Sequence, residues 1–182
     1  MSPQTEPQDQ WYVMRDLKRP NARIRAYQQL SEAGLVVFTP MVTRIADRYG
    51  KRVRETVPFI SDLLFVYATR AILDPVVDRI DTLQYRYVKG GGYCEPLVVR
   101  RQEMERFIAA VDSVNNPRYF RPSEIDAKML GAEIRVICDG PLNGFQGRLL
   151  KIKGSGKKRL LIELPGLLVA AVEVEPDFIQ VL

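Results

Sequence analysis

The chain has 182 residues, of which 46% are hydrophobic and 27% charged, a composition typical of one or two small globular domains. No apolar run reaches the about 20 residues that a membrane helix needs, and the sequence contains no histidine. The lack of histidine removes the commonest general base and the usual zinc ligand, so we expect no enzyme, no cofactor and no metal site.

Residues 1–10 are polar and include two prolines. They lack the basic and then apolar order of a secretory signal, so we expect a disordered leader on a cytoplasmic protein. Cys94 and Cys138 have no metal-ligand spacing and are expected to be reduced thiols.

Residues 11–111 predict an α+β domain of order β-α-β-β-α-β-α with an antiparallel sheet. The first helix is expected to be capped by Asn21 and to stop at Gly34, and the second to start at Asp74-Pro75. The other expected elements are the strands Trp11–Met14, Leu35–Met41, Leu63–Tyr67 and Tyr85–Lys89, the hairpin Arg44–Glu55 and the helix Gln102–Val111.

Residues 112–128 lose this periodicity and contain Asn115-Asn116-Pro117, so we expect a linker. Beyond it, five short strands separated by glycine and proline turns predict an all-β SH3-like barrel over residues 129–182, which removes exposed sheet edges. These strands are expected at residues 134–138, 148–153, 159–164, 167–174 and 179–181.

The turn that connects the first two of these strands carries the most specific pattern of the chain. Pro141 presets a turn, and Gly144 and Gly147 permit tight backbone turns between strands. Generic turn glycines stay as the alternative. The set resembles a KOW motif, the entry hairpin of SH3-like barrels in transcription elongation factors and ribosomal proteins, and comprises Asp139, Gly140, Pro141, Gly144 and Gly147.

With both halves considered, the chain resembles the NusG family, in which an N-terminal NusG domain (11–111 here) and a linker precede a KOW domain (129–182). Trp11-Tyr12-Val13 is similar to the family's opening Trp-Tyr-Val strand. Residues 57–66 resemble the segment that the family writes as Phe-Phe-Pro-Gly-Tyr followed by an apolar strand, but Ile60–Leu63 depart from it. These departures favour a specialised paralogue, similar to RfaH or to the UpxY antiterminators of capsule-polysaccharide operons.

The resemblance implies a transcription elongation and antitermination factor. In the family, an apolar patch of the N-terminal domain binds the clamp helices of RNA polymerase, and pausing and termination are suppressed. The resemblance places Tyr12, Phe59, Ile60, Leu63 and Tyr87 in that patch. For each of them, packing in the core or the sheet is the alternative.

Positive charge is concentrated from Arg15 to Arg54, where ten Lys/Arg and three Asp/Glu give +7, against +5 for the whole chain. Clustered positive charge attracts phosphate, so a polyanion is the expected partner, and the family resemblance implies upstream DNA or its displaced single strand. A solvated face that only aids solubility is the alternative. The residues expected to face nucleic acid are Arg15, Lys18, Arg19, Arg23 and Arg25.

The KOW domain of the family binds either the termination factor Rho or a small-subunit ribosomal protein, and both stay open here. We expect a monomer without a membrane partner. One competing class is a translation-linked RNA-binding KOW protein, which the net charge of only +1 over residues 112–182 (ten Lys/Arg against nine Asp/Glu) disfavours. The other is an enzyme of unrecognised type, which needs a deep polar pocket with a perturbed carboxylate or lysine.

Overall fold

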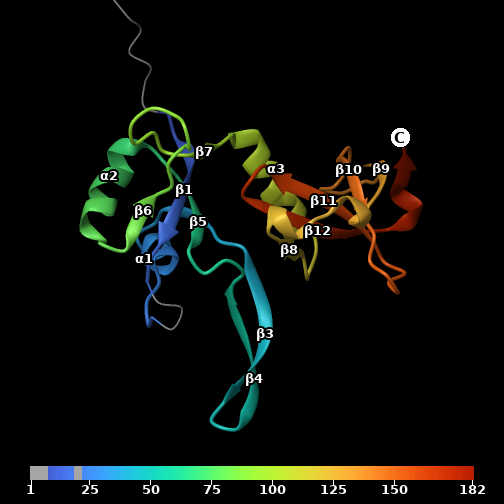
Figure 1. Cartoon of the computed structure of the whole chain (residues 1–182), viewed down its shortest axis with the longest axis horizontal. Coiled ribbons are helices and arrows are strands. Elements are labelled where there is room, and N and C mark those ends of the chain that lie inside the picture. The colour runs from blue at the N-terminus through green and yellow to red at the C-terminus, as the bar shows by residue number, and fades with distance from the viewer. Residues whose placement is uncertain (1–7, 19–21) are drawn as a thin grey trace, which may run out of the picture. The chain divides into compact units, whose positions relative to one another are not determined.

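The computed structural model describes residues 8–18 and 22–182 (Figure 1). The chain forms two compact units, Met1–Arg101 and Gln102–Leu182. The first is mixed α/β and the second is β-rich, as the sequence predicts. Most of the expected leader, residues 1–7, lies outside the described residues, and Gln10 already begins the first strand.

The first unit is built on an antiparallel sheet of order β2-β5-β1-β6, with β7 also paired to β1. β3 and β4 pair only with each other and form a separate two-stranded sheet among the described strands. The elements are β1 (Gln10–Asp16), α1 (Ala26–Glu32), β2 (Val36–Phe38), β3 (Met41–Arg48), β4 (Lys51–Pro58), β5 (Leu63–Ala68), α2 (Arg70–Arg79), β6 (Leu83–Tyr85) and β7 (Val98–Val99).

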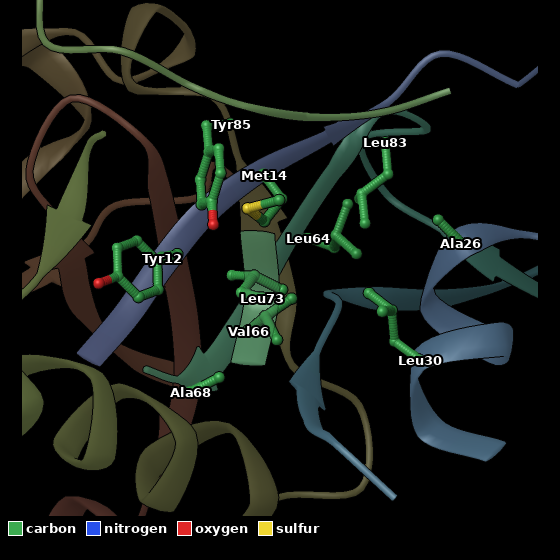
Figure 2. Close-up of a cluster of buried hydrophobic side chains, with 10 residues drawn as sticks. All are labelled: Tyr12, Met14, Ala26, Leu30, Leu64, Val66, Ala68, Leu73, Leu83 and Tyr85. Carbon is green, nitrogen blue, oxygen red and sulfur yellow. The ribbon is translucent and has the colours of Figure 1, made fainter. Parts of the chain in front are cut away.

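One face of this sheet packs against α1 and α2 in a buried apolar cluster (Figure 2). Alternation along β1 places Tyr12 and Met14 on that face, and Leu30 and Leu73 approach it from the two helices. The cluster consists of Tyr12, Met14, Ala26, Leu30, Leu64, Val66, Ala68, Leu73, Leu83 and Tyr85. Close packing of these side chains holds the sheet against the two helices, and the loops of the unit connect these elements.

Helix α1 ends as predicted and begins later than predicted. Gly34 adopts φ +84°, and the amides of Gly34 and Leu35 donate to the carbonyls of Ser31 and Leu30, both at 3.0 Å. These two bonds form a Schellman motif, which satisfies the last carbonyls of the helix. The predicted cap Asn21 lies outside the described residues, and the helix starts at Ala26.

Helix α2 begins five residues before the predicted start, at which Asp74 was the cap and Pro75 the first-turn residue. Thr69 is its N-cap, and the Thr69 hydroxyl accepts a hydrogen bond from the Ile72 amide at 3.3 Å. Asp74 does not cap the helix, because its carboxylate binds Arg70 one turn earlier at 2.7 Å. Pro75 therefore lies inside the helix.

The second unit contains helix α3 and a six-stranded antiparallel sheet of order β13-β9-β10-β11-β12-β8. Helix α3 buries Met104, Phe107, Ala110 and Val111 along one side. The elements are α3 (Arg101–Asp112), β8 (Arg118–Phe120), β9 (Leu130–Val136), β10 (Gln146–Leu150), β11 (Lys158–Leu164), β12 (Leu168–Val174), β13 (Ile179–Val181) and the short 3₁₀ helices η1 (Pro122–Glu124), η2 (Ala127–Met129) and η3 (Pro176–Phe178).

The segment 112–128, expected to be a linker, is folded in the structure. It contains β8, which pairs with β12, and Tyr119 on β8 is only 8% exposed. Phe120 and Ile125 pack against the buried cluster of Leu150, Leu161, Val169 and Ala171. Their apolar contacts hold the segment on the sheet, a long-range effect that local proline and asparagine content does not reveal.

The division between the units also differs from the boundary expected at residue 111. Helix α3 starts at the last residue of the first unit and belongs almost entirely to the second. The Arg106 guanidinium lies 4.5 Å from the centre of the Phe145 ring and donates to the Gln146 carbonyl at 3.2 Å. These contacts attach the helix to the turn that precedes β10.

Candidate binding surfaces

Two of the residues predicted for the apolar patch are core residues. Tyr12 is 4% exposed and its ring lies edge-on to Tyr85 with ring centres 5.6 Å apart (Figure 2). Leu63 opens β5 and is 2% exposed. Side chains this deeply buried offer almost no area to a partner, so the packing alternative holds for both.

The other three predicted patch residues are accessible to different degrees. Phe59 and Ile60 are half-buried in the loop between β4 and β5, where the Phe59 amide donates to the Pro40 carbonyl at 2.7 Å. Tyr87 is 49% exposed beyond the end of β6, and its ring centre lies 6.5 Å from that of Tyr85. The accessible residues therefore come from two separate segments of the first unit.

A polar cluster beside Tyr12 was not predicted from the sequence. The Tyr85 hydroxyl donates to Asp74 at 2.6 Å, and the Arg70 guanidinium lies 5.0 Å from the centre of the Tyr85 ring. Burial, followed by the hydrogen bond to Asp74, raises the pKa of Tyr85, and the hydrogen bond from Arg70 lowers the pKa of Asp74. The only signal for Tyr85 in the sequence is its alternation with Tyr87.

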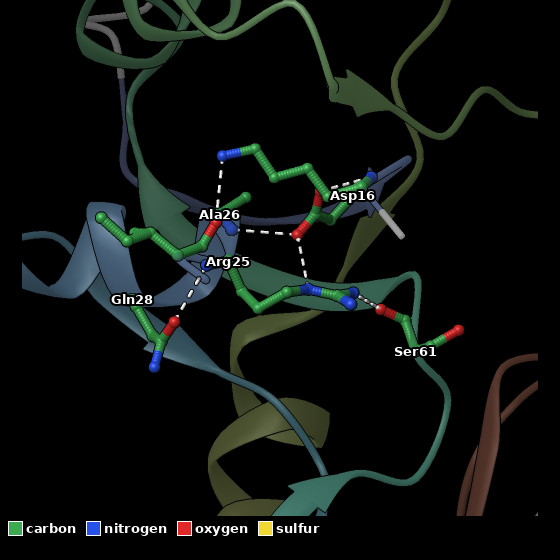
Figure 3. Close-up of polar contacts among 7 residues, drawn as sticks. Asp16, Arg25, Ala26, Gln28 and Ser61 are labelled. Carbon is green, nitrogen blue, oxygen red and sulfur yellow. Dashed lines mark hydrogen bonds and ion pairs between the residues drawn. The ribbon is translucent and has the colours of Figure 1, made fainter. Parts of the chain in front are cut away.

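Arg25, one of the predicted nucleic-acid-facing residues, is buried and paired (Figure 3). Its Nε lies 3.1 Å from Asp16, which also accepts a hydrogen bond from the Ala26 amide at 2.9 Å. Its guanidinium donates as well to the Ser61 carbonyl. The prediction for Arg25 is corrected: its charge is neutralised inside the unit, where it joins β1 to the start of α1 and to the loop before β5.

The remaining members of this basic set vary in accessibility. Arg15 is half-exposed and paired with Asp62 at 3.2 Å, and the Lys18 ammonium donates to the Ile24 carbonyl at 3.0 Å. Arg23 is exposed, and Arg19 lies outside the described residues. Among the described members, Arg15 and Arg23 have exposed side chains, and the charge of Arg15 is shared with Asp62.

More of the accessible positive charge lies on the β3–β4 hairpin. Glu55 on β4 binds Arg44 at 2.7 Å and Arg48 at 3.0 Å, and these hydrogen bonds lower the pKa of Glu55, that from Arg48 most. Lys51, Arg52 and Arg54 lie on the same strand and are exposed. These cations belong to the basic region of the sequence, but none of them was predicted to form part of a site.

Four of the predicted KOW residues, Asp139, Gly140, Pro141 and Gly144, lie in a compact turn between β9 and β10, and the fifth, Gly147, lies in β10. The Asn143 amide donates to the Gly140 carbonyl at 2.9 Å, and the Gly144 amide donates to the Val136 carbonyl at 2.8 Å. Gly144 adopts φ +76°, which favours glycine. A Cβ on Gly147 would lie 2.7 Å from the Leu161 carbonyl oxygen, so this position needs glycine because β11 passes close by.

Small apolar side chains of the same turn line a shallow hollow of the second unit. It is bordered by Pro141 and Leu142 of the turn, by Val114 after α3 and by Phe178 of η3. Within the described residues no group of three or more His, Cys, Asp or Glu side chains could hold a metal ion. No helix of that same part of the chain has the length and apolar character to cross a membrane.

The fold and these surfaces define a two-unit protein built for binding, with an α/β unit followed by a β-rich unit. The family model described as "Transcription termination factor nusG" matches residues 9–108, more than half of the chain. The chain belongs to the NusG family, whose members are non-enzymatic transcription factors that interact with RNA polymerase and nucleic acid. It is accordingly a regulator of transcription elongation or antitermination.

Among solved structures, one of Thermotoga maritima NusG, concerned with the interaction of its domains, is similar to this chain. It matches with 13% sequence identity and a TM-score of 0.48. The match covers 96% of this chain and 98% of that chain. No curated protein sequence matches the chain.

Proposed function

We propose that the first unit binds RNA polymerase at the clamp helices and suppresses pausing and termination. The observation that carries this proposal is the family match over residues 9–108, which spans that unit. A factor of this kind shifts the balance between paused and elongating polymerase by binding the elongating state better, so it needs a docking surface and no catalytic group.

The accessible apolar residues Phe59, Ile60 and Tyr87 are the proposed docking contacts. Tyr87 carries a rigid aromatic ring that is half-exposed, the kind of side chain that often anchors an interface. Tyr12 and Leu63 support this surface from the core and do not contribute contact area. The departures from the family pattern at Ile60–Leu63 keep apolar side chains at positions 60 and 63 and favour a specialised paralogue.

The test is capture of RNA polymerase elongation complexes by the full-length protein. We expect Ile60→Asp/Tyr87→Asp to lose capture, because a charge at a docking surface must be desolvated without a partner. Ile72→Asp is the matched control, since Ile72 is an apolar residue of the same unit and is about as exposed (51%) as Tyr87 (49%). Failure of the wild-type protein to capture polymerase would refute the proposed function, and equal capture by all three proteins would refute only the surface.

Operon specificity is proposed to come from the displaced DNA strand near Arg15 and Arg23. Capsule-polysaccharide operons are the proposed targets because the departures at Ile60–Leu63 favour an antiterminator similar to UpxY. Transcription through a pause and a terminator, on templates with and without the leader of such an operon, tests this step. Equal read-through on both templates would contradict it.

The second unit is proposed to bind a separate protein, either Rho or a small-subunit ribosomal protein. The predicted KOW turn and the hollow beside Leu142 offer an accessible apolar edge for such a contact. Pairwise binding of the full-length protein to purified Rho and to the 30S subunit distinguishes the two partners.

A further inference from the structure

Among the described strands, β3 and β4 pair only with each other, so no strand pairing attaches the β3–β4 hairpin to the sheet of its unit. Its two strands pair in register from Met41↔Pro58 to Arg48↔Lys51, and Figure 1 shows the hairpin extending away from β1, β5 and β6. Ile45 is 68% exposed, and an isolated two-stranded sheet is marginally stable in water. A contact with another molecule would stabilise such a hairpin.

Charge along the hairpin points to a polyanion. Residues 41–58 carry five Lys/Arg and two Asp/Glu, a net charge of +3 out of +5 for the whole chain. Glu55 neutralises only part of this charge, and among the described residues Lys51, Arg52 and Arg54 form no ion pair. Arg48 and Lys51 lie directly opposite each other, a like-charge pairing that disfavours the hairpin itself.

The tip carries an aromatic ring that the fold does not use. Tyr49 and Gly50 connect the strands with φ +52° and +75°, the pattern of a type I′ turn, in which asparagine or glycine is favoured at the first position. Tyrosine in this conformation is strained, and the Tyr49 side chain is fully exposed. No packing in the described part of the chain offsets that cost.

We propose that this hairpin tip binds RNA at an unpaired base, with Tyr49 stacked on the base and Arg48, Lys51 and Arg52 on the adjacent phosphates. Aromatic rings and arginine planes recognise unstacked bases of RNA loops and bulges in this way. This site lies apart from the apolar surface of Phe59, Ile60 and Tyr87, and it does not depend on polymerase docking.

An RNA loop fits the tip better than a continuous single strand or a DNA duplex. Binding of an extended strand uses a basic groove with several successive aromatic rings, whereas this tip offers one ring at the end of a narrow ribbon. Readout of a DNA major groove depends on hydrogen bonds to base edges, and stacking on Tyr49 requires a base that has left the helix. A single base displaced from its stack in an RNA loop needs only one aromatic ring and is already outside the helix.

The test is fluorescence anisotropy of the full-length protein with a labelled RNA stem-loop whose loop sequence is randomised. Base stacking on an aromatic side chain corresponds to about tenfold in affinity, so Tyr49→Asn is expected to weaken binding by that order. Asparagine is favoured at this turn position, so the variant keeps or improves the hairpin. Lys51→Glu/Arg52→Glu is expected to lower the slope of log affinity against log salt by about 0.7 for each phosphate that the variant no longer neutralises.

Matched controls are available elsewhere in the unit. Tyr93→Ala removes another fully exposed tyrosine, and Lys89→Glu/Arg100→Glu reverses two other exposed cations. Both are expected to bind the stem-loop as the wild type does. The proposal would be overturned if Tyr49→Asn bound the stem-loop as tightly as the wild type, or if the controls lost as much affinity as Tyr49→Asn. Tighter binding of the wild type to a DNA duplex or to single-stranded DNA would also overturn it. Capture of polymerase by the same variants tests the proposed function separately.

Discussion

Asp16 and Arg25 form a buried ion pair at 3.1 Å that joins the end of β1 to the N-cap residue of α1. Both side chains are almost fully withdrawn from solvent, at 3% and 7% exposure. Asp16 also accepts from the Ala26 amide at the helix start, where a carboxylate interacts favourably with the helix dipole. A residue that looked like part of a nucleic-acid surface is thus a structural element of the first unit.

Arg25→Met is expected to destabilise the first unit by about 3–5 kcal/mol, because Asp16 would stay buried without its partner. Trp11 is the only tryptophan and lies in β1, so its fluorescence during urea unfolding reports this unit. Arg23→Met is the control, since Arg23 is exposed and its replacement should change stability by less than about 0.5 kcal/mol. Similar midpoints for the two variants would contradict a structural role for the pair.

The hairpin formed by β9, the following turn and β10 should tolerate some glycine replacements and reject others. Gly147→Ala places a Cβ 2.7 Å from the Leu161 carbonyl oxygen and 3.0 Å from Leu160 Cδ1, so we expect a loss of about 1–3 kcal/mol. Gly144→Ala meets no neighbouring atom but forces alanine to φ +76°, at a cost of about 1–2 kcal/mol.

Gly140→Ala is the matched control within the same hairpin. Its Cβ would lie 3.6 Å from the Cys138 sulfur, an ordinary van der Waals contact, so stability should hardly change. Hydrogen exchange of the β10 and β11 amides measures all three variants. We expect Gly140→Ala to lose the least protection from exchange. A larger loss in Gly140→Ala than in Gly144→Ala or Gly147→Ala would show that steric contacts and backbone conformation do not determine the effect of these replacements.

Helix α2 offers a test of where a helix begins. If Thr69 is the N-cap, Thr69→Ala should cost about 1 kcal/mol, and Pro75→Ala should stabilise the unit by about 1–2 kcal/mol because alanine restores an amide inside the helix. If the helix began at Asp74-Pro75, Pro75→Ala would bring no gain. Urea unfolding followed by Trp11 fluorescence distinguishes the two cases.

Periodicity and turn chemistry predicted the elements well because they are local properties. The strand at β1, the stop of α1 at Gly34 and the order of strands after residue 129 follow from alternation and glycine preference. Partner choice is not local. Whether Asp74 caps a helix or binds Arg70 and Tyr85 depends on the position of β6, which no pattern near Asp74 encodes.

The same distinction explains the candidate surfaces. The sequence identifies Tyr12, Leu63 and Arg25 as apolar or basic, but exposure depends on which side of a sheet faces the helices and on the position of Asp16. The cations of the hairpin remained exposed because its two strands pair with each other alone. The sequence therefore shows in which segment the positive charge is concentrated, but the pairing of strands determines which of these cations are accessible.

Tyr119 gives the second unit a predictable response to alkaline pH. Burial, with a smaller effect of the Asp112 carboxylate, raises the pKa of Tyr119 from 10.0 to about 12. Because the pKa is raised in the folded state, the contribution of neutral Tyr119 to stability is fully present below pH 10.0 and is lost as the pH rises toward about 12, since ionisation then favours the unfolded chain.

We therefore expect the midpoint of thermal unfolding, followed by the β-sheet signal in circular dichroism, to fall between pH 10.0 and about 12. Tyr119→Phe should make this fall smaller, because phenylalanine cannot ionise. In absorbance titrations of phenolate formation, the same variant should lack one late-titrating tyrosine. An early-titrating tyrosine missing from Tyr119→Phe would mean that β8 does not shield this side chain, and the 112–128 segment would then be the free linker that the sequence suggested.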